Sequence, residues 1–205
     1  METPPTVTTD PVSQTVKTGS FVTFTAAASG SPAPAIQWQL STNAGASFSD
    51  ILGANSTSLV FMANSLQNGY QYRAVLTNDC GTATTAPATL TVIGPIAMLT
   101  PTSIDFGNVY LHQLTWKVVS LRNTGNSPLT INRMSLKTGI NTDWADFPFL
   151  SMCPPSVPAG KSCAIYVFYN ADDLGVDTAT LSIVDNAPGS PQVISLTGTV
   201  IKKTH

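Results

Sequence analysis

Hydrophobic and polar residues alternate along several short stretches of this chain. In the segment 21–28, Val22 and Phe24 fall on one face of an extended strand, and Phe21 and Thr23 fall on the other. Alternation with a period of two predicts a half-buried β-strand. The same pattern recurs over residues 36–40, 59–61, 72–77 and 86–92. Turn residues separate these runs and none has a sustained helical period, so the pattern predicts an antiparallel β-sandwich.

The dipeptide Gly94-Pro95 interrupts this series and predicts a short, stiff joint between two domains. A second series of alternating segments follows, over residues 103–109, 114–123, 129–136, 161–169, 178–184 and 192–200. We therefore predict an all-β protein of two tandem antiparallel β-sandwiches, over residues 1–94 and 95–205. Within 129–136 the apolar residues change parity between Ile131 and Met134, which indicates a bulge or a strand that switches sheets near Asn132-Arg133.

The first half contains five short sequence blocks that occur in a fixed order, at residues 19–26, 30–38, 72–74, 78–81 and 88–92. Together they resemble an immunoglobulin-like domain of the I-set kind, in the form common in large bacterial surface proteins. Ala26 and Ala74 stand where that family carries an inter-sheet disulfide. The resemblance implies that Trp38 packs between the sheets and that Tyr72 forms the family's tyrosine corner, with its hydroxyl bonded to nearby backbone.

Further blocks lie in the second half, at residues 104–109, 121–131, 159–167, 179–183 and 195–199. They resemble the ASH/Hydin-like immunoglobulin-fold module of bacterial "choice-of-anchor D" proteins. That family usually closes its cysteine-bearing strand with Phe-x-Pro, where this chain has Tyr169-Asn170-Ala171, so the turn is expected to differ. The two resemblances imply tandem immunoglobulin-like sandwiches, and neither family is defined by a catalytic residue.

Composition and charge narrow the classes of partner. Only 10% of residues are charged, the net charge is −2, and the nine Lys and Arg are scattered along the chain. Nucleic acid is therefore not an expected partner, because binding it needs clustered cations. The longest apolar run, residues 163–169, is far shorter than the roughly 20 residues of a membrane span.

The first residues lack a signal-peptide pattern, while the chain is rich in Ser and Thr and poor in charge. Both features fit a segment of a longer secreted protein, so we predict an extracellular or bacterial cell-surface location.

The three cysteines differ in their surroundings. Cys153 and Cys163 flank Pro154-Pro155 and a turn signal at residues 158–160. A zinc site needs about four ligands, and these two have no His neighbours. We favour a disulfide, which would stabilise by about 2–3 kcal/mol and indicate an oxidising compartment, over the alternative of two buried thiols. Cys80, in the tight turn 78–81, has no mate in its own domain and is predicted to be a free thiol.

Candidate catalytic and metal-binding groups are few. His112 lies in a turn without a Ser or Cys nucleophile beside it, and His205 lies at the chain end. Residues 170–177 partly match a calcium loop, but Leu174 and Leu181 occupy positions that need oxygen ligands. Asp143 and Asp146 are paired carboxylates of the kind that hydrolyse glycosides, yet small sandwiches offer no deep cleft. We predict no catalytic residue, no metal and no cofactor.

Aromatic residues around position 147 are the candidate binding residues. Trp144, Phe147 and Phe149 could form an exposed platform that stacks on a sugar ring or inserts into a partner. Alternatively, Phe147 and Phe149 cap the core of the second sandwich. Trp38 and Trp116 are assigned to the core or to strand faces.

These observations favour a non-enzymatic structural or adhesive segment, a stalk or adhesin, of a larger secreted bacterial surface protein. The expected partners are neighbouring modules of the same parent chain, a surface protein or glycan, and further copies that associate through exposed edge strands. The alternatives are an accessory carbohydrate- or protein-binding module of a secreted polysaccharide-degrading enzyme and, third, a hydrolase.

Overall fold

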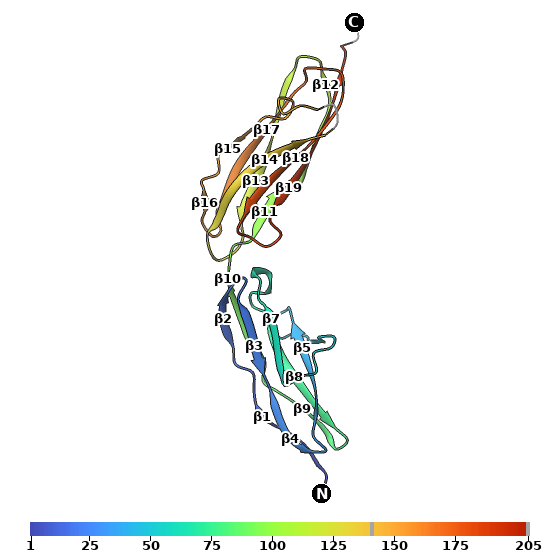
Figure 1. Cartoon of the computed structure of the whole chain (residues 1–205), viewed down its shortest axis with the longest axis vertical. Coiled ribbons are helices and arrows are strands. Elements are labelled where there is room, and N and C mark those ends of the chain that lie inside the picture. The colour runs from blue at the N-terminus through green and yellow to red at the C-terminus, as the bar shows by residue number, and fades with distance from the viewer. Residues whose placement is uncertain (140–141, 204–205) are drawn as a thin grey trace. The chain divides into compact units, whose positions relative to one another are not determined.

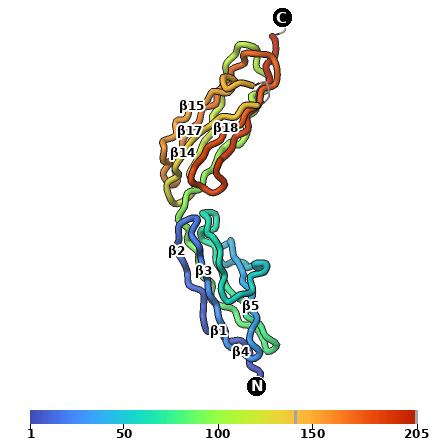
Figure 2. Tube along the Cα trace, viewed as in Figure 1, coloured from blue at the N-terminus to red at the C-terminus, as the bar shows by residue number. Residues whose placement is uncertain are grey.

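The structure is a computed structural model that describes residues 1–139 and 142–203. It is built almost entirely of β-strands, and the chain divides into two compact units, Met1–Gly94 and Pro95–His205 (Figures 1 and 2). Each unit is an immunoglobulin-like β-sandwich. His205 lies outside the described residues.

The first unit contains ten strands and one 3-10 turn, η1 (Ser65–Gln67). One sheet has the order β2-β10-β8-β5-β6 with β9 paired to β8, and two further pairs, β1-β4 and β3-β7, complete the sandwich. The strands are β1 (Thr3–Thr9), β2 (Gln14–Lys17), β3 (Phe21–Thr25), β4 (Ala27–Ser31), β5 (Ala35–Ser41), β6 (Ser49–Asp50), β7 (Ser58–Met62), β8 (Gln71–Asn78), β9 (Gly81–Thr84) and β10 (Ala88–Ile93).

The predicted strand over residues 21–28 is divided in two. β3 pairs with β7, whereas β4 pairs with β1. Between them, the Ala26 N–H donates to the Thr57 carbonyl at 2.9 Å. The alternation of side chains continues through Ala26, which is why the sequence pattern does not reveal the change of partner.

The interior of the first unit is filled by aromatic and aliphatic side chains. Trp38, Phe24 and Leu90 are fully buried, and the Trp38 indole N–H donates to the Ser56 carbonyl at 2.9 Å. Ala26 and Ala74 are buried as well, so two methyl groups occupy the interior where a disulfide would otherwise lie. Burial of this apolar surface stabilises the unit.

Tyr72 is buried as expected, but it does not form the expected tyrosine corner. Its ring stacks on Phe24 at a centroid distance of 4.9 Å and lies 5.2 Å from the ring of Phe61. Within the described part of the chain its hydroxyl makes no hydrogen bond, and the residue lines a pocket instead. The predicted bond to the backbone is therefore wrong, because stacking in the aromatic cluster, rather than a polar contact, fixes this ring.

The described residues of the second unit form nine strands in two sheets. One has the order β11-β13-β17-β15 and the other has the order β12-β19-β18-β14-β16. The strands are β11 (Ala97–Thr100), β12 (Ser103–Tyr110), β13 (Leu114–Asn123), β14 (Leu129–Thr138), β15 (Phe149–Ser151), β16 (Ser156–Val157), β17 (Ser162–Asn170), β18 (Gly175–Asp185) and β19 (Gln192–Ile201).

Pairing in both units departs in one respect from a purely antiparallel sandwich. β2 pairs with β10, and β12 with β19, in parallel. In each case a strand near the start of the unit lies beside its last strand, and most of the unit's sequence separates the two. Such a pair leaves no local sequence signal, because parallel neighbours need a long connection.

The change of parity within β14 has a structural cause. The register of β14 against β18 shifts between Ile131 and Arg133, which is the bulge that the sequence predicts. The shift lets Leu129 and Leu136 both pack on the core despite their different parity.

Candidate binding surface and acidic cluster

The sheet β11-β13-β17-β15 carries apolar side chains on both of its faces. Successive side chains of a strand point to opposite faces, and Val119, Ile165 and Val167 point inward and are fully buried. The alternate residues therefore point outward. We call this outward surface the apolar face; its central residues are Leu114, Trp116, Val118, Leu150, Tyr166 and Phe168.

Strand register places these residues side by side. Trp116 lies opposite Phe168, and Val118 lies opposite Tyr166, which in turn lies opposite Leu150 of β15. The Trp116 and Tyr166 rings are 5.8 Å apart and tilted by 52°. Trp116 remains 57% exposed, so aromatic and aliphatic surface stays open to solvent across three strands.

The opposite sheet of the same unit has an ordinary solvated outer face. On β18 and β19 the inward residues include Leu181, Ile183 and Ile194, all fully buried. The outward residues between them are mostly hydroxylic: Thr178, Thr180, Ser182, Ser195 and Thr197. Two sheets of one sandwich thus differ in what they show to solvent, and a large exposed apolar patch is typical of an interaction site.

The predicted aromatic platform around position 147 is only partly present. Trp144 is 76% exposed in the loop before β15. Phe147 is fully buried and stacks on Tyr169 at 4.9 Å, and Phe149 is half-buried against the core. The predicted exposed platform is therefore wrong for Phe147 and Phe149, whose rings pack on the core, and Trp144 is the one of the three that is mainly exposed.

Sequence reasoning left the role of Trp116 open between core and strand face. The ambiguity has a physical cause. In β13 the polar Thr115 and Lys117 share the parity of the buried Val119, so alternation over 114–118 directs Trp116 toward the core. The signal that was available is β17, which is apolar on both parities although one face of its sheet must meet solvent.

Carboxylates from two distant segments meet at one end of the second unit. Side-chain oxygens of Asp146, Asp172 and Asp173 all lie within 4.8 Å of one another. With Thr142 and Asp143 they line a pocket of about 260 Å³. The Asn170 N–H donates to the Asp146 carbonyl at 2.9 Å, which ties the loop before β15 to the end of β17. The sequence predicted the two acidic groups separately and did not predict that they adjoin.

Burial governs the ionisation of this cluster. The residue Asp146 is 3% exposed, and its carboxyl accepts a hydrogen bond from the Asp143 N–H at 2.6 Å. Desolvation is the main reason why its pKa rises to about 7, and the neighbouring carboxyls of Asp172 and Asp143 raise it further. Clustered carboxylate oxygens are also ligands of the kind that Ca²⁺ takes, six to eight at a time.

Asp177 belongs to a different network and faces inward. It accepts a hydrogen bond from the Tyr169 hydroxyl at 2.6 Å and another from the Thr142 hydroxyl at 3.5 Å. Burial, followed by the Asp177 carboxylate, raises the pKa of Tyr169 strongly. The partial calcium-loop match over residues 170–177 therefore does not form one site, since Asp177 supports the core while Asp172 and Asp173 are exposed.

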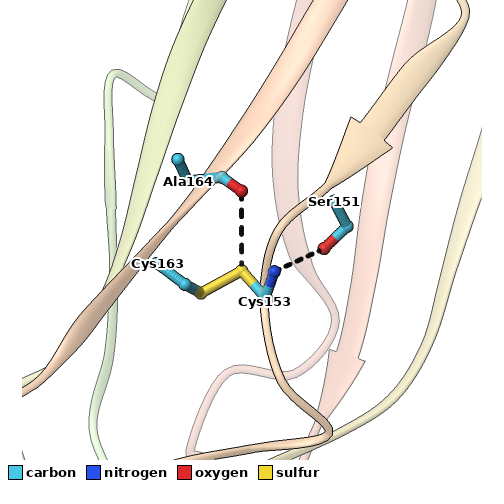
Figure 3. The surroundings of a disulfide bond; sticks show 4 residues. All are labelled: Ser151, Cys153, Cys163 and Ala164. Atoms are coloured by element: carbon cyan, nitrogen blue, oxygen red, sulfur yellow. Dashed lines mark hydrogen bonds between the residues drawn. A yellow bond between two sulfur atoms is a disulfide. The ribbon is translucent and has the colours of Figure 1, made fainter.

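The structure joins Cys153 and Cys163 in a disulfide that links the segment after β15 to β17 (Figure 3). The Cys153 N–H donates to the Ser151 hydroxyl at 3.2 Å. The Cys153 sulfur lies 4.0 Å from the Ala164 carbonyl oxygen, which is a packing contact because a disulfide sulfur has no proton to donate.

Cys80 is an exposed free thiol in the turn between β8 and β9. Its sulfur lies 3.8 Å from a carboxylate oxygen of Glu2. His112 is exposed in the turn between β12 and β13, with a positive φ of 67°. The role of His112 is to adopt the backbone conformation of this turn, because few residues other than Gly tolerate a positive φ and His is among them.

The first unit has a pocket of about 500 Å³ beside β7. Its lining combines the apolar side chains of Leu59 and Phe61 with the loop that contains Leu52 and Ser56. No titratable cluster meets there among the described residues.

Two known protein families match parts of this chain. Residues 98–200, just over half of it, match the family described as "Protein of unknown function (DUF1573)". The chain belongs to the DUF1573 family. Residues 6–94 match a second description, "Domain of unknown function (DUF8696)". In the described part of this DUF1573 chain, no helix has the length and apolar character needed to cross a membrane.

A curated relative is considerably longer than this chain. Over 90 residues the DUF1573 chain is 46% identical to "Endoglucanase C" of Cellulomonas fimi, a match that covers 44% of the chain and 8% of the relative.

Solved structures similar to the whole chain include titin immunoglobulin tandem domains, at 14% identity and a TM-score of 0.43, covering 99% of this chain and 100% of that one. A protein of unknown function from Porphyromonas gingivalis aligns at 13% identity and a TM-score of 0.42, covering 96% of this chain and 99% of that one.

Proposed function

We propose that this chain is a non-enzymatic structural or adhesive segment, a stalk or adhesin module pair, of a larger secreted bacterial surface protein. The observation that carries the proposal is the match to Endoglucanase C, where 90 residues at 46% identity make up only 8% of a bacterial protein. A stretch the size of one sandwich that recurs inside a much longer chain behaves as a reusable module.

Two features of the structure support this proposal. Each unit fills its own core, as expected of domains that fold independently. The Cys153–Cys163 disulfide suits an oxidising, extracytoplasmic compartment. The finer part of the proposal is that residues 95–205 act as an ASH/Hydin-like module that connects neighbouring domains at the cell surface.

Two measurements test this function. Turnover on panels of esters and glycosides should equal that of buffer, and hydrolysis that disappears in Asp146→Asn would show an enzyme. Single-molecule pulling on the chain should give two separate unfolding events, as expected of a load-bearing module pair. Extension without a resolved unfolding event would contradict a stalk.

A second candidate function is an accessory carbohydrate-binding module of a secreted polysaccharide-degrading enzyme. The name of the Cellulomonas fimi relative and the exposed indole of Trp144 favour it. An exposed aromatic ring is the kind of side chain that stacks on sugars. On a glycan array and in gels containing soluble β-glucan, Trp144→Ala should then lose binding, while Leu52→Ala, at an exposed apolar residue of the first unit, should retain it. No binding by the unaltered chain would rule this candidate out.

A further inference from the structure

We infer that the apolar face of the second unit is a homotypic interface, against which the same face of a second copy of this chain packs. The face carries almost no charge. On β13 and β17, all of whose residues are described, Arg122 is the one charged outward residue, and it lies at the end of the sheet. The centre, around Val118 and Tyr166, is wholly uncharged, which suits an apolar partner and no strongly charged one.

The face is of moderate size. Nine residues of β13 pair with β17, and the outer strands β11 and β15 widen this pair over four and three residues. At about 3.3 Å per residue and about 4.8 Å between strands, the two central strands measure roughly 30 by 10 Å. The face is therefore smaller than the roughly 800 Å² that each partner buries in a standard interface, and it suits a weak, reversible dimer.

The two ends of the face carry opposite charges. Arg122 lies opposite Ser162 at one end, next to exposed Lys161, whereas the other end runs from Asn170 into exposed Asp172 and Asp173. Two copies can pack face to face with their strands antiparallel, about a two-fold axis that lies in the interface and is perpendicular to the strands. In this arrangement the basic end of each copy meets the acidic end of the other. The apolar centre then meets its own equivalent, as an isologous interface requires. A parallel arrangement would oppose like charges, which is unfavourable.

A second copy fits this face better than a sugar chain does. Trp116 and Tyr166 can stack on a sugar ring, but the aliphatic side chains of Leu114, Val118 and Leu150 beside them offer no hydrogen bonds to its hydroxyls. A neutral polysaccharide is therefore the competing outcome of the test.

The experiment is sedimentation equilibrium of the full chain over a wide concentration range, on a Cys80→Ser background that prevents disulfide-linked dimers. The weight-average mass should rise from 21.5 kDa toward twice that value. Val118→Asp should weaken dimerisation about a hundredfold or more, because it introduces a carboxylate into an apolar interface. Val193→Asp is the matched control: it makes the same change at a similarly exposed strand position (45% against 39%) on the solvated sheet and should leave the mass curve unchanged.

The antiparallel arrangement has its own test. Arg122→Glu should weaken association by about threefold to tenfold, and the double variant Arg122→Glu/Asp173→Lys should recover it. Circular dichroism and the melting temperature of each variant establish that it is folded. A chain that stays monomeric at the highest concentration, or equal effects of Val118→Asp and Val193→Asp, would overturn the proposal. So would binding of a monomeric chain to cellulose that Val118→Asp abolishes, since the face would then belong to a glycan.

Discussion

At the residue scale, Tyr72 shows how an aromatic residue can be fixed without its polar group. Its ring packs against both Phe24 and Phe61, and burial, followed by the nearby Tyr70, raises its pKa to about 12. Because no described residue bonds the hydroxyl, Tyr72→Phe should change the free energy of unfolding by less than about 0.5 kcal/mol. Tyr72→Ala should cost about 3–5 kcal/mol through the lost ring. Urea denaturation of both variants measures this, and a loss above about 1 kcal/mol for Tyr72→Phe would reveal a bonded hydroxyl.

Asp146 gives the second residue-level prediction, which concerns pH. The pKa of its carboxyl is about 7 when folded and near 4 when unfolded, so the folded state holds this proton more tightly. The contribution of this proton to the free energy of unfolding is fully present below about pH 4 and is lost as the pH rises through about 7. In Asp146→Asn, which keeps an oxygen for the Asp143 N–H, that loss should be absent. The difference between the two proteins should reach roughly 2 kcal/mol.

Melting temperatures from pH 4 to pH 8 measure this effect. Asp143, Asp172 and Asp173 face Asp146 and remain in both proteins, so the comparison shows how the cluster titrates with and without the Asp146 carboxyl. Asp185, whose pKa is also raised by burial, contributes equally to both curves. Parallel curves for the two proteins would contradict the raised pKa.

At the scale of elements, alternation located the strands but not their neighbours or their outer faces. β13 begins and ends where the pattern predicts, because its turns are marked and its inward residues alternate. The short strands β15 and β16 were not predicted, since two or three residues show no period. The outward position of Trp116 could not be predicted either, because the polar Thr115 and Lys117 alternate with it and the pattern directs its ring toward the core.

The disulfide belongs to this scale because it joins two elements, the segment after β15 and β17. It closes a short loop that contains β16, so the double variant Cys153→Ser/Cys163→Ser should lose about 2–3 kcal/mol of stability, mainly through a less constrained unfolded chain. Urea denaturation measures the loss. Thiol titration of the unreduced, denatured protein should find one thiol, that of Cys80, and three thiols would refute the pairing.

At the scale of the whole molecule, the sequence revealed the number of sandwiches better than the sites they carry. The joint at Gly94-Pro95 is visible because Gly and Pro break the alternation, and the two units divide there. The acidic cluster was not visible as one feature, because Asp146 and Asp172 are far apart in sequence and meet only through the packing of a loop on the end of β17. Local patterns report local structure, and sites assembled from distant segments need the fold.

The two cores share no residue, and this leads to a prediction about cooperativity. One core is built around Trp38 and Leu90, the other around Tyr169 and Leu181, and each draws only on its own unit. Fragments 1–94 and 95–205 should therefore each fold, and their far-ultraviolet circular dichroism should add up to that of the whole chain. In calorimetry, Trp38→Ala, which removes about 3–5 kcal/mol of core packing, should lower only the transition that the first fragment shows alone. If both transitions shift together, the units fold as one and the modular interpretation fails.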